Sequence, residues 1–244
     1  MSDITHQNAP PKPERVLLIV AHPDDIEFGV AGSVARWTAE GAQVSYCIVT
    51  DGSSGSNKPD TNLTELIQQR QREQRAAAEK VGVHEVRFLG YPDGVLQPTL
   101  ELRRTLTRII RELRPERVVC QDPTTVLVAD RYINHPDHRA AGEAALYAAF
   151  PSAETRPIFP ELLAEGYEPH HVNEVYLTLS LQPTTYVDIS DVIEQKIEAL
   201  LCHASQVGED AAHWVREWNA EIGKEAGCAF AEGFRVMNLR REEA

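Results

Sequence analysis

Two short clusters hold the side chains best suited to chemistry. The first is HPDD at residues 22–25, directly after the apolar run 16–20, and the second is NHPDH at residues 134–138. Imidazoles and carboxylates are the side chains that bind catalytic metals and transfer protons. One Pro-Asp-Asp run would indicate only the start of a helix, because proline and acidic residues favour the first helical turn. Capping alone does not explain two such clusters, each after a predicted strand.

Three of these side chains make a set of metal ligands. His22, Asp25 and His138 supply two imidazoles and one carboxylate. This set suits one catalytic Zn²⁺ per chain with open positions for water, and it also suits Fe²⁺ or another divalent metal. Such a cation lowers the pKa of bound water to about 7. An acid and a base beside the ligands favour hydrolysis over oxygenase chemistry.

The neighbouring polar side chains suit proton transfer. Asp24 adjoins Asp25 but should point in another direction, so it could act as a general base. His135 lies three residues before His138, and in its protonated form it could stabilise an oxyanion and protonate a leaving amine. Asp137 could orient His135 or support the metal ligands.

The elements that must position these clusters alternate along the chain. The predicted strands are 16–20, 44–50, 84–89 and 117–120, and the predicted helices between them are 27–40, 63–81 and 100–113. This order predicts an α/β fold that is Rossmann-like, with a mostly parallel sheet flanked by helices on both faces. The first and fourth strands should be neighbours, which would bring the two clusters together. Arg70 is expected on an exposed helix surface, paired with Glu73.

The second half of the chain is less regular. We predict a helix at 138–150, an irregular insert at about 151–172, strands at 175–180 and 185–187, and helices at 189–205 and 211–241. The insert would be a lid or an oligomer contact, with His170 and His171 exposed. Trp214 and Trp218 would be core or interface anchors rather than site residues. The loop DGSSGS at 51–56 is either a plain connection or a substrate contact.

Composition narrows the class of protein. The net charge of −13, from 24 basic and 37 acidic residues, argues against a nucleic-acid partner. Four scattered cysteines without a C-x-x-C pair suit a cytoplasmic protein. No apolar segment is long enough to span a membrane. We expect a disordered leader at 1–14 and a single domain at 15–244, whose C-terminal helices occupy about 190–241.

The two clusters also carry a family resemblance. AHPDDIEFG at 21–29, followed by NHPDHR at 134–139, resembles the LmbE/PIG-L family of zinc-dependent N-deacetylases, which act on N-acetylglucosamine conjugates. Further similar segments are TDG at 50–52, the R-x-x-E of 70–73, YPDG at 91–94 and AEGFR at 231–235. The resemblance implies zinc ligands at His22, Asp25 and His138, a general base at Asp24, and a cationic stabiliser or acid at His135. It also implies that Asp137 is the partner of His135 and that Arg70 contacts substrate.

The expected function is removal of an acetyl group from the nitrogen of a small amino-sugar conjugate by metal-activated water. One alternative is an amidase that cleaves a larger thiol or antibiotic conjugate by the same chemistry. Another is a non-catalytic nucleotide-binding module, for which Gly29-x-x-Gly32 is a weak signal. A metal-stabilised structural protein would not need Asp24 and His135. The sequence leaves open whether the protein forms a homo-oligomer.

Overall fold

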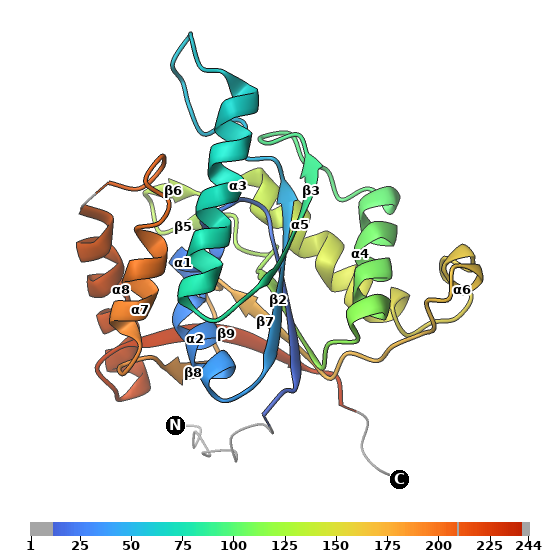
Figure 1. The fold of residues 1–244 in the computed structure, drawn as a ribbon. Coiled ribbons are helices and arrows are strands. Elements are labelled where there is room, and N and C mark those ends of the chain that lie inside the picture. The colour runs from blue at the N-terminus through green and yellow to red at the C-terminus, as the bar shows by residue number, and fades with distance from the viewer. Residues whose placement is uncertain (1–11, 209, 241–244) are drawn as a thin grey trace.

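A seven-stranded sheet organises the chain (Figure 1). The computed structural model describes residues 12–208 and 210–240, so most of the expected leader lies outside the described residues. The strand order is β3-β2-β1-β4-β7-β9-β8. Their bounds are β1 Arg15–Val20, β2 Gln43–Thr50, β3 Glu85–Tyr91, β4 Arg117–Gln121, β7 Glu174–Thr178, β8 Thr185–Asp188 and β9 Ala231–Asn238. The strands from β3 to β7 are parallel, and β9 runs antiparallel to both β7 and β8. The predicted mostly parallel α/β fold is confirmed.

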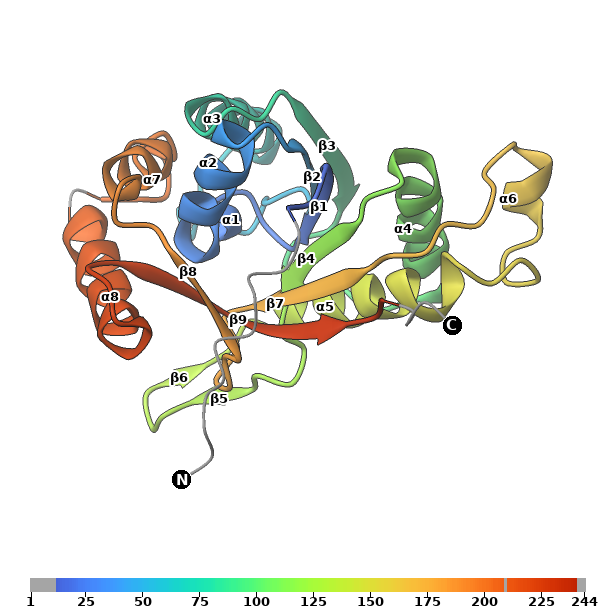
Figure 2. The ribbon, with the colours of Figure 1, turned by 90° about the horizontal axis from the view of Figure 1, so that it is seen from below.

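Helices cover both faces of this sheet (Figure 2). They are α1 Asp25–Gly29, α2 Ala31–Ala39, α3 Leu63–Lys80, α4 Leu100–Leu113, α5 Pro136–Tyr147, η1 Ala148–Ser152, α6 Glu161–Ala164, α7 Ile193–Leu200 and α8 Asp210–Ala226. Alternate residues of β1 serve the two faces, as a strand requires. Leu17 and Ile19 pack in the cluster with α4 and α5, whereas Leu18 and Val20 pack in the cluster with α2 and α3. None of the helices within 12–208 and 210–240 could cross a bilayer.

The position of β1 decides where the site forms. β1 lies between β2 and β4, and Ile19 pairs with Cys120 in parallel register. The carboxyl ends of these strands therefore meet at one edge of the sheet. A small antiparallel hairpin, β5 (Leu127–Val128) and β6 (Tyr132–Ile133), lies between β4 and α5 in the chain. The predicted adjacency of the first and fourth strands is confirmed.

The helix predicted at 27–40 is in fact two helices. Pro23 and Asp24 precede α1, and Val30 has a non-helical backbone that separates α1 from α2. The carboxylate of Glu232, from β9, accepts hydrogen bonds from the backbone N–H groups of Gly32 (2.9 Å) and Ser33 (2.7 Å). These contacts satisfy amides at the start of α2 that local sequence leaves without a partner. The amides that a phosphate would need are thus already bound by the protein itself, which argues against the nucleotide-binding alternative.

The C-terminal segment is only partly helical. The predicted helix 211–241 ends at Ala226, and 231–238 forms β9 between β7 and β8. Phe234 is fully buried and contacts the rings of Tyr176 and Trp37. Burial of this ring against residues distant in sequence stabilises the strand, so the prediction of continuous helix was wrong.

The insert packs beside α4. The guanidinium of Arg111, itself buried, donates hydrogen bonds to the carbonyls of Ser152, Ala153 and Thr155. The two histidines of the insert are not exposed, contrary to prediction. Buried His170 hydrogen-bonds with the carbonyl of Pro115 (2.7 Å), and half-buried His171 with that of Leu239 (2.8 Å). These histidines hold the insert to the domain.

Candidate active site

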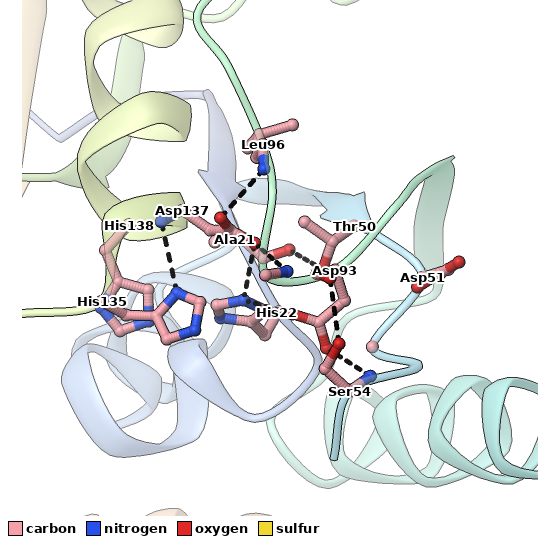
Figure 3. A network of polar contacts seen from close by, with 12 residues as sticks. Ala21, His22, Thr50, Asp51, Ser54, Asp93, Leu96, His135, Asp137 and His138 are labelled. Carbon is pink, nitrogen blue, oxygen red and sulfur yellow. Dashed lines mark hydrogen bonds and ion pairs between the residues drawn. The ribbon is translucent and has the colours of Figure 1, made fainter. Parts of the chain in front are cut away.

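The two polar clusters meet at the carboxyl ends of β1 and β4 (Figure 3). His22 follows β1, while His135 is the N-cap of α5 and His138 lies in its first turn. The ring centroid of His22 is 4.6 Å from that of His135 and 5.1 Å from that of His138. Topology thus assembles three imidazoles from two distant segments.

Asp25 lies between two of these rings. Its Oδ1 is 3.0 Å from Nε2 of His138, and its Oδ2 is 3.4 Å from Nδ1 of His22. The other ring nitrogen of His138, Nδ1, is 2.9 Å from Oδ1 of Asn134, which fixes the ring with Nε2 facing Asp25. Although burial opposes ionisation, His138 and His22 hold the pKa of Asp25 well below its usual range. The expected ligand set is therefore spatially compact.

The three imidazoles, with His135 in place of Asp25, form a second set of donors that could hold a divalent cation. Among the described residues, one nitrogen each from His22, His135 and His138 lies within 4.8 Å of the others. Burial lowers the pKa of His22, but the carboxylates of Asp25, Asp137 and Asp93 outweigh it and raise this pKa to about 12. The local field therefore favours positive charge at His22, and a metal ion would supply that charge in place of the proton.

Asp24 has an unusual backbone and an altered acidity. Its φ is 95°, in the left-handed region, and its N–H donates to Oε1 of Gln74 at 3.0 Å. Its Oδ2 pairs with Nη2 of Arg70 at 3.1 Å. Burial and the charge of Asp25 outweigh Arg70 and raise the pKa of Asp24 to about 6. A carboxylate of this pKa is still mostly ionised at neutral pH and is a stronger base than an ordinary aspartate.

Arg70 is not the exposed helix residue that its position suggested. It is 4% exposed and donates to the carbonyls of Gly52 and Pro23, both at 2.8 Å. The expected partner, Glu73, instead accepts a hydrogen bond from Ser205 at 2.6 Å. The residue spacing along α3 could not predict this arrangement. Pro23, the 51–56 loop and α3 come together only in the folded chain.

Of the two roles predicted for Asp137, its contacts agree with support of a metal ligand rather than with orientation of His135. The backbone N–H of Asp137 donates to Nδ1 of His135 (3.2 Å), while its carboxylate accepts from the N–H groups of Gly94 (2.7 Å) and Leu96 (3.1 Å). Asp137 Oδ2 is 3.4 Å from Nε2 of His22, so its side chain supports His22 rather than orienting His135. Burial and the charge of His22 lower the pKa of His135, which disfavours the protonated form that we predicted.

Sequence reasoning gave no role to Asp93. Its Oδ1 is 3.1 Å from Nε2 of His22, and its Oδ2 accepts from the N–H of Ser54 at 3.0 Å. Although burial opposes ionisation, His22 lowers the pKa of Asp93. The sequence did contain one indication of a role for Asp93, which is its position in the YPDG turn after the third strand, at the same edge of the sheet.

A cavity of ≈ 920 Å³ opens over the cluster. Ser54 and Gly55 line it, which favours the substrate-contacting alternative for the 51–56 loop. No residue of the 151–172 insert does, so the insert is not a lid over this cavity. Trp214 and Trp218 also line the cavity, contrary to the prediction that they lie outside the site.

Comparison with known proteins agrees with this geometry. The family model described as PIG-L: GlcNAc-PI de-N-acetylase matches residues 17–149. The chain is 35% identical over 232 residues to the diacetylchitobiose deacetylase of Thermococcus kodakarensis, covering 92% of this chain and 83% of the relative. It is 30% identical over 208 residues to a probable N-acetyl-alpha-D-glucosaminyl L-malate deacetylase 2 of Bacillus anthracis, covering 83% and 86%.

A solved structure extends the match to three dimensions. The N,N'-diacetylchitobiose deacetylase of Pyrococcus horikoshii, complexed with its inhibitor MPG, superposes with a TM-score of 0.88 at 30% identity, covering 96% of this chain and 88% of that one. The resemblance drawn from the two histidine clusters is confirmed, and the chain belongs to the PIG-L (LmbE) family, whose relatives here are named as deacetylases.

Proposed function

We propose that this protein hydrolyses the N-acetyl amide of an N-acetylglucosamine conjugate. The observation that carries the proposal is the Asp24-Asp25 pair, in which Asp25 contacts two imidazoles and Asp24 has a pKa raised to about 6. One carboxylate is thus placed to bind a metal and its neighbour to accept a proton. The names of the related deacetylases support the amino-sugar substrate.

We propose His22, Asp25 and His138 as the ligands of one Zn²⁺ per chain. When bound there, the cation would acidify a water molecule and polarise the amide carbonyl. Asn134 would keep His138 oriented through its 2.9 Å contact with Nδ1. Asp93 and Asp137 would hold His22 from its other side, within 3.1 and 3.4 Å of Nε2.

The remaining residues supply the proton transfers. Asp24 accepts a proton from the attacking water and then gives it to the amine as the amide C–N bond breaks, so that acetate and the free amine leave. Nδ1 of His135 already accepts a hydrogen bond from Asp137, so the neutral ring carries its proton on Nε2. That N–H can donate to the oxyanion without a resident imidazolium.

We propose a cytoplasmic location for the protein, and its cysteines support this proposal. Cys47 and Cys120 are free and buried, and burial raises the pKa of the Cys47 thiol to about 12 and also raises the pKa of the Cys120 thiol. Thiols of this kind behave as small apolar side chains rather than as disulfide partners.

Acetate release from a panel of N-acetylglucosamine conjugates tests the function. The wild-type protein with Zn²⁺ should release one acetate for each amine formed. Asp24→Asn should lower kcat by a factor of about 10²–10⁴ while retaining the metal, because only the proton acceptor is lost. Asp51→Asn is the matched control, since that carboxylate lies at the same edge and, within the part of the chain that the structure describes, accepts a hydrogen bond only from Ser53. Acetate release from no member of the panel, or an active Asp24→Asn protein, would overturn the proposal.

A further inference from the structure

A series of buried hydrogen bonds connects the backbone of Asp24 to His203. The N–H of Asp24 donates to Oε1 of Gln74 at 3.0 Å, and Nε2 of Gln74 donates to Oε1 of Glu27 at 2.9 Å. The other carboxylate oxygen of Glu27, Oε2, is 3.0 Å from Nε2 of His203. Glu27, Gln74 and His203 are each 0% exposed. We call these three residues the support chain.

The support chain joins three segments that are far apart in the sequence. Glu27 lies on α1, Gln74 lies on α3, and His203 follows the end of α7. These helices lie on the same face of the sheet (Figure 2). His203 thus reaches the proposed general base, Asp24, from behind the site, through Glu27 and Gln74.

The hydrogen bonds of the support chain fix the orientation of one amide. An ionised carboxylate only accepts hydrogen bonds, so Gln74 must turn its Nε2 toward Glu27. Its Oε1 then faces the N–H of Asp24, which only donates. If the amide turned over, two N–H donors would face each other at Asp24. The placement of the Glu27 carboxylate therefore decides whether Gln74 can hold Asp24.

His203 holds the carboxylate of Glu27 at its second oxygen. Burial lowers the pKa of His203, but the hydrogen bond and the charge of Glu27 outweigh burial and raise this pKa. Nε2 of His203 is the donor in the pair, because the carboxylate only accepts. The other ring nitrogen, Nδ1, has no hydrogen-bond partner among the described residues. The hydrogen bonding of this ring is therefore directed at Glu27 alone.

The backbone of Asp24 needs contacts that hold it. Its φ of 95° lies in the left-handed region, where a residue other than glycine stays only when the surrounding structure fixes it. Asp24 also lines the cavity over the histidine cluster. A rotation of this backbone would change the direction in which the carboxylate points into the cavity, and catalysis is sensitive to such small displacements.

We propose that His203 is a positioning residue for the general base, because it fixes Glu27 and, through Glu27 and Gln74, the backbone of Asp24. The inference rests on the proposed function, in which Asp24 accepts a proton from water. Without His203, Oε2 of Glu27 has no donor, so the carboxylate can turn and Gln74 loses its fixed partner. The carboxylate of Asp24 is then held less firmly, while the metal ligands keep their own contacts.

Hydrogen exchange at the Asp24 amide tests the support chain directly. His203→Phe keeps a ring of similar size but removes the donor to Glu27, so the N–H of Asp24 should exchange about tenfold faster than in the wild-type protein. The N–H of Gly32, which donates to Glu232 at 2.9 Å, is the internal reference and should keep its rate. NMR of isotope-labelled protein measures both amides.

Steady-state kinetics on an N-acetylglucosamine conjugate provide the second test. The kcat of His203→Phe should fall about tenfold, with KM and the Zn²⁺ content unchanged, because only the placement of the base is altered. His203→Gln, whose amide nitrogen can take the place of Nε2, should recover most of kcat and the slow exchange at Asp24. His203→Asn is too short to reach Glu27 and should resemble His203→Phe, so it serves as the test if the phenylalanine variant does not fold.

Ser205→Ala is the matched control. Ser205 lies two residues after His203, and its hydroxyl donates to Oε2 of Glu73 at 2.6 Å. It thus joins the same segment to the same helix, α3, without belonging to the support chain. We expect the wild-type kcat and the wild-type exchange rate at Asp24.

Four results would overturn the proposal. They are a wild-type exchange rate at Asp24 in folded His203→Phe or His203→Asn, an equal acceleration at Gly32, an unchanged kcat despite faster exchange at Asp24, and a His203→Gln protein as impaired as His203→Phe. An equal acceleration at Gly32 would indicate a structural role alone. If the wild-type protein releases acetate from no conjugate, the proposed function fails, while the exchange rate at Asp24 still decides whether His203 holds this backbone.

Discussion

Asp24 shows how much of a residue's chemistry depends on distant partners. The sequence places it beside a metal ligand and suggests a base, but its acidity depends on burial, on Asp25 and on Arg70 from α3. Its left-handed backbone is held by Gln74, also from α3. The motif therefore predicts which residues gather at the site, while the pKa and the role of Arg70 require the folded chain.

Replacement of Arg70 should move the pH dependence of catalysis. The positive charge of Arg70 lowers the pKa of Asp24, which stands at about 6, so Arg70→Met should raise that pKa further. Asp24 must be ionised to accept a proton, and the acidic limb of the kcat/KM profile should then shift to higher pH. Arg70→Lys, which keeps the charge, should shift it less. Profiles of both variants between about pH 5 and about pH 8, a range that brackets the pKa of Asp24 at about 6, provide the measurement. An acidic limb that does not move in Arg70→Met would contradict the role given to Arg70.

The elements around the site are joined by buried polar groups that alternation of apolar residues does not reveal. Gln74 of α3 donates to Glu27 of α1 at 2.9 Å, and Glu27 meets Nε2 of His203, just after α7, at 3.0 Å. Most helices and strands could be predicted from spacing, including 100–113 without error. The break before α2 and the strand β9 could not, because Glu232 and Phe234 act across long sequence separations.

Loss of the Gln74 contact to the Asp24 N–H should impair catalysis. Gln74→Ala frees the N–H of Asp24, so its carboxylate should be held less firmly and kcat should fall about tenfold with metal content unchanged. Gln68→Ala, at an exposed position of the same helix, is the control. Steady-state kinetics with metal analysis would check this, and a kcat equal to that of the control would count against the contact.

The buried ion pair behind α1 should matter for stability. Nζ of Lys196 pairs with Glu232 at 2.6 Å, and both side chains are 0% exposed. Lys196→Met leaves the carboxylate without its cation and should lower the free energy of unfolding by about 3–5 kcal/mol. Lys80→Met removes a pair whose lysine is 50% exposed and should cost less than about 1 kcal/mol. Urea unfolding would measure the free energy of unfolding of both variants. Equal losses would contradict the claim that the buried pair contributes more than the exposed one.

At the scale of the whole molecule, the sheet order brings the chemistry together. The β-α alternation was enough to predict that β1 and β4 adjoin, and with them the two histidine clusters. The position of Trp214 and Trp218 in the cavity wall could not be predicted, because α8 lies between β8 and β9 in the chain and β9 runs antiparallel to its neighbours. A helix after the last predicted strand had no defined place in a parallel topology.

The central claim is that a metal held by His22, Asp25 and His138 is required for amide hydrolysis. The most direct measurement is the rate of acetate release from an N-acetylglucosamine conjugate by metal-stripped protein as Zn²⁺ is added back. We expect no release from the stripped protein and a rate that rises with Zn²⁺ until one equivalent per chain is bound. A stripped protein that works at the full rate, or a reloaded protein that releases no acetate, would contradict the account.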